Sequence, residues 1–187
     1  MQPLGRRRAR RAAAGTVHQA YVGATVICPG DNVSLEIRQA RPSDLPDLLE
    51  LMREFYAESD YPLNAEHARD AFLPLLSRGE LGQVWLASYD GVVAGHLVLT
   101  FVHSMEYGGR SAFIDDLYVR PMLRNRGVGK ALLRYARSAC EALGIRAMHV
   151  EVSRVNGPAQ AIYRGVGFQS TDRELLTVAL ADPTHAA

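Results

Sequence analysis

The stretch LRNRGVGKALLRYA, residues 123–136, places a basic turn with two glycines directly before an apolar helical pattern. The first turn of a helix leaves backbone NH groups unpaired and carries the positive end of the helix dipole. Glycine lets a ligand come close to these NH groups, and neighbouring basic side chains add charge. The stretch therefore predicts a binding site for an anion, most often a phosphate.

Two familiar phosphate-binding loops do not fit this turn. A nucleotide P-loop has the pattern G-x-x-x-x-G-K-[S/T], but Arg124 stands at its first glycine and Ala131 at its hydroxyl position. A dinucleotide fingerprint needs a third glycine, and Leu132 occupies that place. The anion is therefore expected to belong to another class of phosphate compound.

Strand and helix patterns on both sides of the turn predict one mixed α/β domain. Strands are expected at 33–40, twice within 83–102 around Asp90-Gly91, and at 111–119, 146–153 and 174–180, with a further short one at 167–170. Helices are expected from Pro42, at 65–78, from Val128 to Gly144 and at 157–166. The order β-α-α-β-β-β-α-β-α-β indicates an α/β fold around a mixed sheet, spanning 33–181 and followed by a tail at 182–187.

The N-terminal residues differ from the rest in charge. Five arginines precede the first acidic residue, Asp31, so that removing residues 1–30 changes the formal net charge from +1 to −4. We interpret 1–32 as a basic, poorly ordered extension, with a misplaced start, a targeting segment and a functional basic arm as alternatives. The acidic body argues against nucleic-acid binding and suits a cationic substrate.

Cysteines, apolar runs and histidines argue against several other classes. Cys28 and Cys140 form no disulfide framework, so a reducing, cytoplasmic setting is expected. No apolar run approaches the roughly 18 residues of a membrane-spanning helix, so no membrane partner is expected. The histidines show no metal-ligand spacing, so no metal is expected, and His96 and His149 are interpreted as hydrogen-bonded core or sheet-face residues.

Two motifs indicate which phosphate compound the turn binds. The turn fits R-x-x-G-x-G, and a later segment fits N-x-x-A-x-x-x-Y-x-x-x-G-F with Asn156, Ala159, Tyr163, Gly167 and Phe168. With the order of elements, these motifs resemble the GCN5-related N-acetyltransferases, the GNAT superfamily. The resemblance covers nearly all of 33–181 and implies the GNAT acyl-CoA N-acyltransferase fold, with acetyl-CoA as acetyl donor.

The resemblance also implies which residues bind acetyl-CoA. The strand before the turn leaves its neighbour, the pantetheine arm pairs with its backbone like an additional strand, and a backbone NH there polarises the thioester carbonyl. The pyrophosphate lies in the turn, where Asn125 replaces a glycine common in the family and tolerates a left-handed backbone. The implied residues are Leu117, Tyr118, Val119, Arg124, Asn125, Arg126, Gly127, Val128, Gly129, Lys130, Asn156 and Ala159.

The chemistry requires a neutral amine, a stabilised oxyanion and a proton for the departing thiolate. Tyr163 matches the general acid of the family, and a phenol with an ordinary pKa of roughly 10 stays protonated. A core tyrosine is the alternative interpretation. Cys140 is expected to face inward, which suits direct transfer in a ternary complex without a covalent acyl-enzyme.

The base is expected among the acidic residues of the strand before the turn. Asp115 and Asp116 are neighbours and should point to opposite faces. Asp115 is expected to share one face of the strand with Phe113 and Leu117. Asp116 is expected to share the other face with Ile114 and Tyr118. An acidic pair before L-[F/Y]-V is similar to acetyltransferases of polyamines and diamines, which favours Asp115 as base or amine anchor, with Glu151 in reserve.

The acceptor is expected beside the first two helices. Carboxylates and aromatic rings there, Phe55, Tyr56 and Glu58, would hold an ammonium together with Asp115, although a solvated acidic face with core aromatics is the alternative. The expected reaction is acetylation of a primary amine on a small molecule of polyamine, amino sugar or amino acid type. The alternatives are a protein N-terminal or lysine acetyltransferase and a catalytically silent CoA-binding sensor or interaction module. The resemblance also allows a homodimer, but no stretch identifies an interface.

Overall fold

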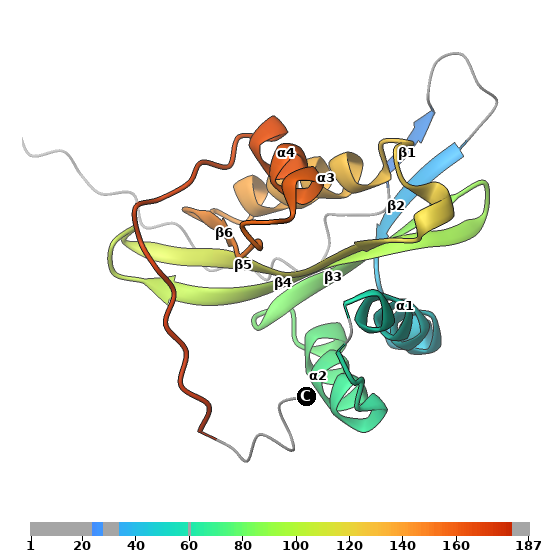
Figure 1. The fold of residues 1–187 in the computed structure, drawn as a ribbon, viewed down its shortest axis with the longest axis horizontal. Helices are drawn as coiled ribbons and strands as arrows, with labels where there is room; N and C mark the ends of the chain where they lie inside the picture. Colours follow the sequence, from blue (N-terminus) through green and yellow to red (C-terminus); the bar gives the residue numbers. More distant parts are fainter. Residues whose placement is uncertain (1–23, 28–33, 60, 181–187) are drawn as a thin grey trace, which may run out of the picture.

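The computed structural model describes residues 24–27, 34–59 and 61–180, and Figure 1 shows their arrangement. The strands are β1 (Ala24–Ile27), β2 (Ser34–Gln39), β3 (Gly82–Tyr89), β4 (Val92–Ser104), β5 (Gly109–Val119) and β6 (Met148–Val150). The helices are α1 (Leu45–Glu58), α2 (Ala65–Ser77), α3 (Val128–Ala142) and α4 (Gly157–Gly165), with short 3-10 turns at Pro42–Asp44 and Pro121–Leu123. The order from β2 to α4 is the predicted one.

The strands form one mixed sheet in the order β1-β2-β3-β4-β5-β6. Neighbouring strands are antiparallel except β5 and β6, which are parallel and are connected through α3. A parallel pair needs such a crossover, because the chain must return to the same end of the sheet. The predicted hairpin is confirmed at Asp90 and Gly91, whose φ angles of 50° and 77° are typical of a primed two-residue turn.

Helices cover both faces of the sheet (Figure 1). The α3 face carries α3 and α4 over a core that includes Trp85, Leu97 and Cys140, and the α1 face carries α1 and α2 over a second core that includes Leu48 and Phe72. The predicted inward position of Cys140 is confirmed, since its side chain is buried. Within the described ranges, no helix combines the length and apolar character that a membrane span requires.

The structure differs from the prediction at both ends of the domain. Residues 24–27, assigned to the N-terminal extension, form β1 and pair with β2. The strands expected at 167–170 and 174–180 are wrong, because these segments pair with no strand in the described part of the chain, and the strand expected at 146–153 is shorter. Four apolar side chains of the last segment are exposed by 60% to 94%: Leu175, Leu176, Val178 and Leu180. Their alternation is not sufficient for a strand where no neighbouring strand edge accepts it.

Candidate active site

β5 and β6 pair over only three residues, after which β5 continues without β6. The ladder joins only residues 112–114 to residues 148–150. From Asp116 to Val119, β5 is paired with β4 but with no second strand among the described residues. The expected separation of the strand before the glycine turn is therefore observed, and its open edge can accept an extended chain through backbone hydrogen bonds.

A bulge interrupts β5 at the point of separation. Ile114 lies opposite Leu99 and Asp116 lies opposite Val98, so Asp115 is an additional residue without a partner on β4. A bulge of this kind bends the strand and changes the direction of its side chains. The strict alternation assumed in the sequence analysis therefore does not hold across Asp115.

The bulge corrects the predicted faces of the two aspartates. Ile114 and Leu117 both pack in the core of the α3 face, whereas Tyr118 packs in the core of the α1 face. Asp116 lies opposite Val98, which belongs to the α1 face, and Phe113 lies opposite Thr100, two residues further along β4. Phe113, Asp116 and Tyr118 therefore share the α1 face. The predicted pairings of Asp116 with Ile114 and of Phe113 with Leu117 are wrong.

Asp116 has the more perturbed carboxyl of the two. Its side chain is partly buried, and burial together with the charge of Asp115 raises its pKa to about 7. Asp115 is exposed, although partial loss of water around its carboxyl also raises its pKa. Burial and both carboxylates raise the pKa of Tyr56 on α1, which places this predicted acceptor residue within the electrostatic reach of the pair. A carboxyl with a pKa near neutrality can exchange a proton with an amine at physiological pH.

Tyr163 lies on α4, a short helix that begins at a side-chain cap. Asn156 accepts a hydrogen bond from the backbone NH of Ala159 at 3.1 Å, so the asparagine of the predicted motif caps the helix. The ring of Tyr163 is buried and packs edge-on against Phe168 at 5.7 Å. Burial and the charge of Asp116 raise the pKa of Tyr163 to about 12. Its phenol therefore remains protonated at neutral pH.

The glycine turn has the expected backbone. Gly127 precedes α3 with a φ of 83°, and Asn125 has a φ of 60°, so the predicted tolerance of asparagine for the left-handed region is confirmed. No side chain among the described residues caps α3, which leaves the NH groups of its first turn available. Arg126, stacked over the Tyr89 ring at 5.4 Å, and Lys130 are exposed beside this turn. An uncapped helix, a curved backbone and exposed cations together fit a pyrophosphate.

The next two residues of the motif hold the turn against the sheet. Val128 is buried in the α3-face core. A Cβ on Gly129 would meet Val119 Cγ2 at 3.6 Å, an ordinary contact. The backbone after Gly127 is therefore fixed beside the last residue of β5, which brings the turn and the open strand edge together.

Two predicted binding residues have their charged groups engaged with each other. Arg124 donates from Nη2 to Glu58 Oε2 at 2.6 Å and from Nε to the carbonyl of Val119 at 2.8 Å. Glu58 also accepts from the Tyr118 hydroxyl at 2.9 Å, and the Phe55 ring lies 5.5 Å from the Tyr118 ring. Glu58 is thus not a free acceptor ligand in this arrangement, and the Arg124 guanidinium lies over Tyr118, which packs on the α1 face.

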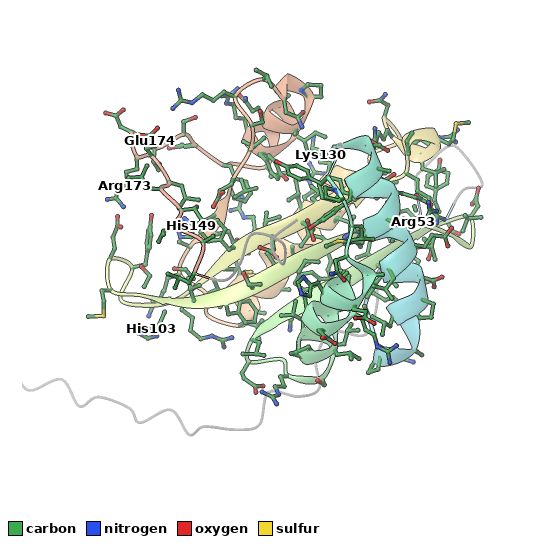
Figure 2. All side chains as sticks on the ribbon, turned by 60° about the horizontal axis from the view of Figure 1, so that its bottom comes forward. Arg53, His103, Lys130, His149, Arg173 and Glu174 are labelled. Carbon is green, nitrogen blue, oxygen red and sulfur yellow. The ribbon has the colours of Figure 1, made fainter. Side chains whose placement is uncertain are left out.

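A groove that the sequence analysis did not predict runs along β6 and α4. Its volume is about 1330 Å³, and Tyr163, Phe113, His149 and Glu151 are among its lining residues. Phe113 and His149 are cross-strand partners with ring centroids 5.4 Å apart, and Tyr107 lies 5.5 Å from His149. In Figure 2, His149 lies toward the end of the molecule that carries Arg173, away from Arg53 on α1. The alternation of 146–153 marked His149 as a sheet-face residue, but its stacking partner depends on the strand register.

His96 corrects another expectation. It is completely buried on β4 between the rings of Phe72 and Tyr118, at 6.3 and 6.4 Å, but neither ring nitrogen has a hydrogen-bond partner in the described part of the chain. The predicted core position of His96 is therefore confirmed, but the prediction that its ring is hydrogen-bonded is wrong for the described part of the chain. Burial lowers the pKa of His96 to about 4. Among the described residues, no group of three or more His, Cys, Asp or Glu side chains is arranged to hold a metal ion.

Comparison with known proteins identifies the family of this chain. The acetyltransferase (GNAT) family matches residues 45–168, more than half of the chain and the whole region from α1 to the end of the tyrosine motif. The chain belongs to this family. It is therefore an acetyl-CoA-dependent N-acetyltransferase, and the GNAT fold predicted from its motifs is confirmed.

Individual GNAT relatives cover most of the domain. The peptidyl-lysine N-acetyltransferase YiaC of Escherichia coli (strain K12) is 34% identical over 73% of this chain and 84% of its own length. An aminoglycoside N(6')-acetyltransferase type 1 of Stenotrophomonas maltophilia is 29% identical over 73% of this chain and 88% of its own. The crystal structure of the integron cassette protein HFX_CASS3, from the mobile metagenome of Cole Harbour Salt Marsh, is similar with a TM-score of 0.73 and 40% identity. It covers 80% of this chain and 93% of that one.

Proposed function

We propose that this GNAT enzyme transfers the acetyl group to a primary amine of a small molecule bound beside Asp116, by direct attack in a ternary complex. One observation carries the proposal. The charge of the Asp116 carboxyl raises the pKa of the Tyr163 phenol, and Asp116 lies where β5 loses its pairing with β6, at the inner end of the open strand edge that leads from the glycine turn. A base and an acid are thus available near one point.

The cofactor residues follow from the same geometry. Acetyl-CoA supplies the activated acetyl thioester. The backbone of Leu117, Tyr118 and Val119 offers it an unpaired strand edge, and the first turn of α3 after Gly127 offers NH groups to its pyrophosphate. Arg126 and Lys130 add exposed positive charge. These residues would hold acetyl-CoA with its thioester directed toward Asp116 and Tyr163.

The proton transfers are divided between the two groups. An ammonium acceptor loses a proton to the Asp116 carboxylate, and the free amine attacks the thioester carbonyl. The C–N bond forms, the C–S bond breaks, and the Tyr163 hydroxyl gives its proton to the departing sulfur. The second proton of the new amide nitrogen then passes to the Tyr163 phenolate, which restores the hydroxyl. Asp116 with a pKa of about 7 and Tyr163 with a pKa of about 12 are suited to these opposite roles.

Asp116 takes the role that the sequence analysis gave to Asp115. The bulge places Asp116 on the α1 face, beside Tyr56, and its partial burial strengthens its interaction with an ammonium. Asp115 is exposed one residue away and serves as a second anionic anchor for the acceptor. Glu151 lines the groove that also contains Tyr163, so it remains the reserve base.

The acceptor is proposed to be a small amine with a ring or chain that follows the α1 face. The aminoglycoside acetyltransferase relative supports this class. Acetylation of a protein lysine is the second candidate, because the peptidyl-lysine acetyltransferase YiaC has the higher identity, 34% against 29%. Both candidates present a primary amine to the same two residues.

Release of free CoA thiol from acetyl-CoA tests the proposal. The purified chain is assayed against sisomicin, spermidine, free amino acids and a lysine peptide, with Tyr163→Phe as the matched variant. We expect turnover with an amine class, reduced about 10²-fold or more in Tyr163→Phe, with CoA affinity retained. Turnover with only the lysine peptide would favour the second candidate. CoA binding without thiol release for any amine would support a silent CoA-binding module instead.

A further inference from the structure

The end of α1 is joined to the start of the cofactor turn by a set of short polar contacts. Glu58 accepts from Arg124 at 2.6 Å through one carboxylate oxygen and from the Tyr118 hydroxyl at 2.9 Å through the other. Arg124 also donates to the carbonyl of Val119 at 2.8 Å. These contacts therefore hold the end of α1 to the last residues of β5 and to the first residue of the R-x-x-G-x-G motif.

These contacts connect the two binding regions of the enzyme. On the acceptor side, the same turn of α1 carries Tyr56, whose phenol is influenced by Asp116 and Asp115. On the cofactor side, Arg124 directly precedes Asn125, the left-handed residue of the turn. A ligand that fixes the turn therefore also restrains the last turn of α1.

We infer that Glu58 and Arg124 form a positioning pair that transmits cofactor binding from the glycine turn to the acceptor helix α1. The inference rests on the proposed function, because it assigns the two sides of the pair to cofactor and acceptor. Arg124 acts through Glu58 and the Val119 carbonyl. The cations left for the phosphates are Arg126 and Lys130, which are exposed and make no ion pair with a described acidic residue.

The neighbouring ion pair supplies a matched control. Arg120 donates to Glu54 at 3.0 Å, one helical turn earlier on α1, and to the carbonyl of Val93 at 2.9 Å. This pair also joins α1 to the end of β5, but it does not include a residue of the glycine turn. Glu54→Gln therefore removes the same charge from the same helix without breaking the connection to Arg124.

Hydrogen exchange with and without CoA tests the inference in the full chain. In the wild type, we expect CoA to slow exchange in the turn at 124–130 and, by about fivefold or more, in the last turn of α1. In Glu58→Gln and Arg124→Gln, the turn should still be protected and α1 should not respond. Glu54→Gln should behave as the wild type. The Glu58→Gln/Arg124→Gln double variant should lose the α1 response to the same extent as either single variant, because both substitutions break the same connection.

The outcomes separate this inference from the proposed function. CoA affinity in Arg124→Gln should fall by less than about fivefold, because an exposed ion pair contributes about 1 kcal/mol at most. CoA that protects the turn of the wild type but not α1 would overturn the inference and leave the acetyltransferase proposal intact. An α1 response that persists in Glu58→Gln would also overturn it. A failure of CoA to bind at all would contradict the proposed function itself.

Discussion

The carboxyl of Asp116 on β5 acts on the phenol of Tyr163 on α4. Burial and the Asp116 charge raise the pKa of Tyr163 to about 12, while burial and the Asp115 charge raise the pKa of Asp116 to about 7. Two titratable groups of one site thus have pKa values far apart, which is the arrangement that separates an acid from a base. The bulge at Asp115 directly precedes Asp116 and therefore decides the face on which that carboxyl leaves the strand.

The first prediction concerns Asp116→Asn. Because the amine must lose a proton to the carboxylate, kcat/KM of the wild type should rise with pH through about 7, the pKa of Asp116. Asp116→Asn should lower kcat by about 10²-fold and remove this rise. A pH series of initial rates at saturating acetyl-CoA measures both effects. Asp115→Asn is the control and should change mainly the KM of the acceptor. The assignment is wrong if Asp115→Asn abolishes the pH dependence and Asp116→Asn does not.

The same carboxyl predicts a stability effect of known sign. The pKa of Asp116 is higher in the folded state than its ordinary value of 3.8, so the folded state binds the proton more tightly than the unfolded state. Its contribution to stability is therefore lost as pH rises from about 4 to about 7. Asp116→Asn should be more stable than the wild type at pH 8, and the difference should shrink toward pH 4. Urea denaturation at the two pH values measures it, and a difference independent of pH would contradict the raised pKa.

The sequence predicted the parts of the site that depend on local chemistry. The left-handed backbone at Asn125 follows from the conformational preference of asparagine. The bulge could not be predicted in this way, because it is defined by which residues of β4 lie opposite β5. The contact between Glu58 and Arg124 joins residues 66 positions apart and depends on the packing of α1 on the sheet. The bulge and the ion pair therefore depend on strand register and helix packing, which local sequence patterns do not determine.

Gly127→Ala should weaken CoA binding through the backbone alone. The φ of 83° at Gly127 is in the left-handed region, where a Cβ costs about 1–2 kcal/mol, although no atom lies within 4 Å of that Cβ. If the turn relaxes to another backbone conformation, we expect CoA affinity to fall about tenfold. If the turn keeps its conformation, we expect the strain to lower the melting temperature. Gly129→Ala is the control, since its Cβ meets Val119 at an ordinary 3.6 Å. Equal losses in the two variants would show that side-chain volume matters and backbone conformation does not.

His96→Leu should change the acid sensitivity of the fold. His96 is buried without a hydrogen-bond partner in the described ranges, and its pKa is lowered to about 4 from 6.5. The folded state therefore binds this proton less well, and stability is lost as pH falls from about 6.5 to about 4. Removing the imidazole should reduce the loss of unfolding free energy at pH 5 by on the order of 2 kcal/mol. Chemical denaturation at pH 7 and pH 5 measures this, with His103→Gln on the exposed end of β4 as control. An unchanged loss in His96→Leu would mean that other groups dominate.

Phe113→Ala should weaken acceptor binding without slowing the chemical step. Phe113 shares the α1 face with Asp116 and stacks on His149 at a centroid distance of 5.4 Å, so it provides an apolar surface next to the proposed base. Loss of this surface should raise the KM of the acceptor about tenfold, which corresponds to about 1.4 kcal/mol, and leave kcat within about twofold. The control is Phe101→Ala, the same truncation on the α3 face, where Arg110 lies 4.5 Å over the ring. Steady-state kinetics with the amine that gives turnover measure the KM of the acceptor in the two variants. An equal rise of KM in both would show that general loosening of the hairpin, and not contact with the acceptor, is responsible.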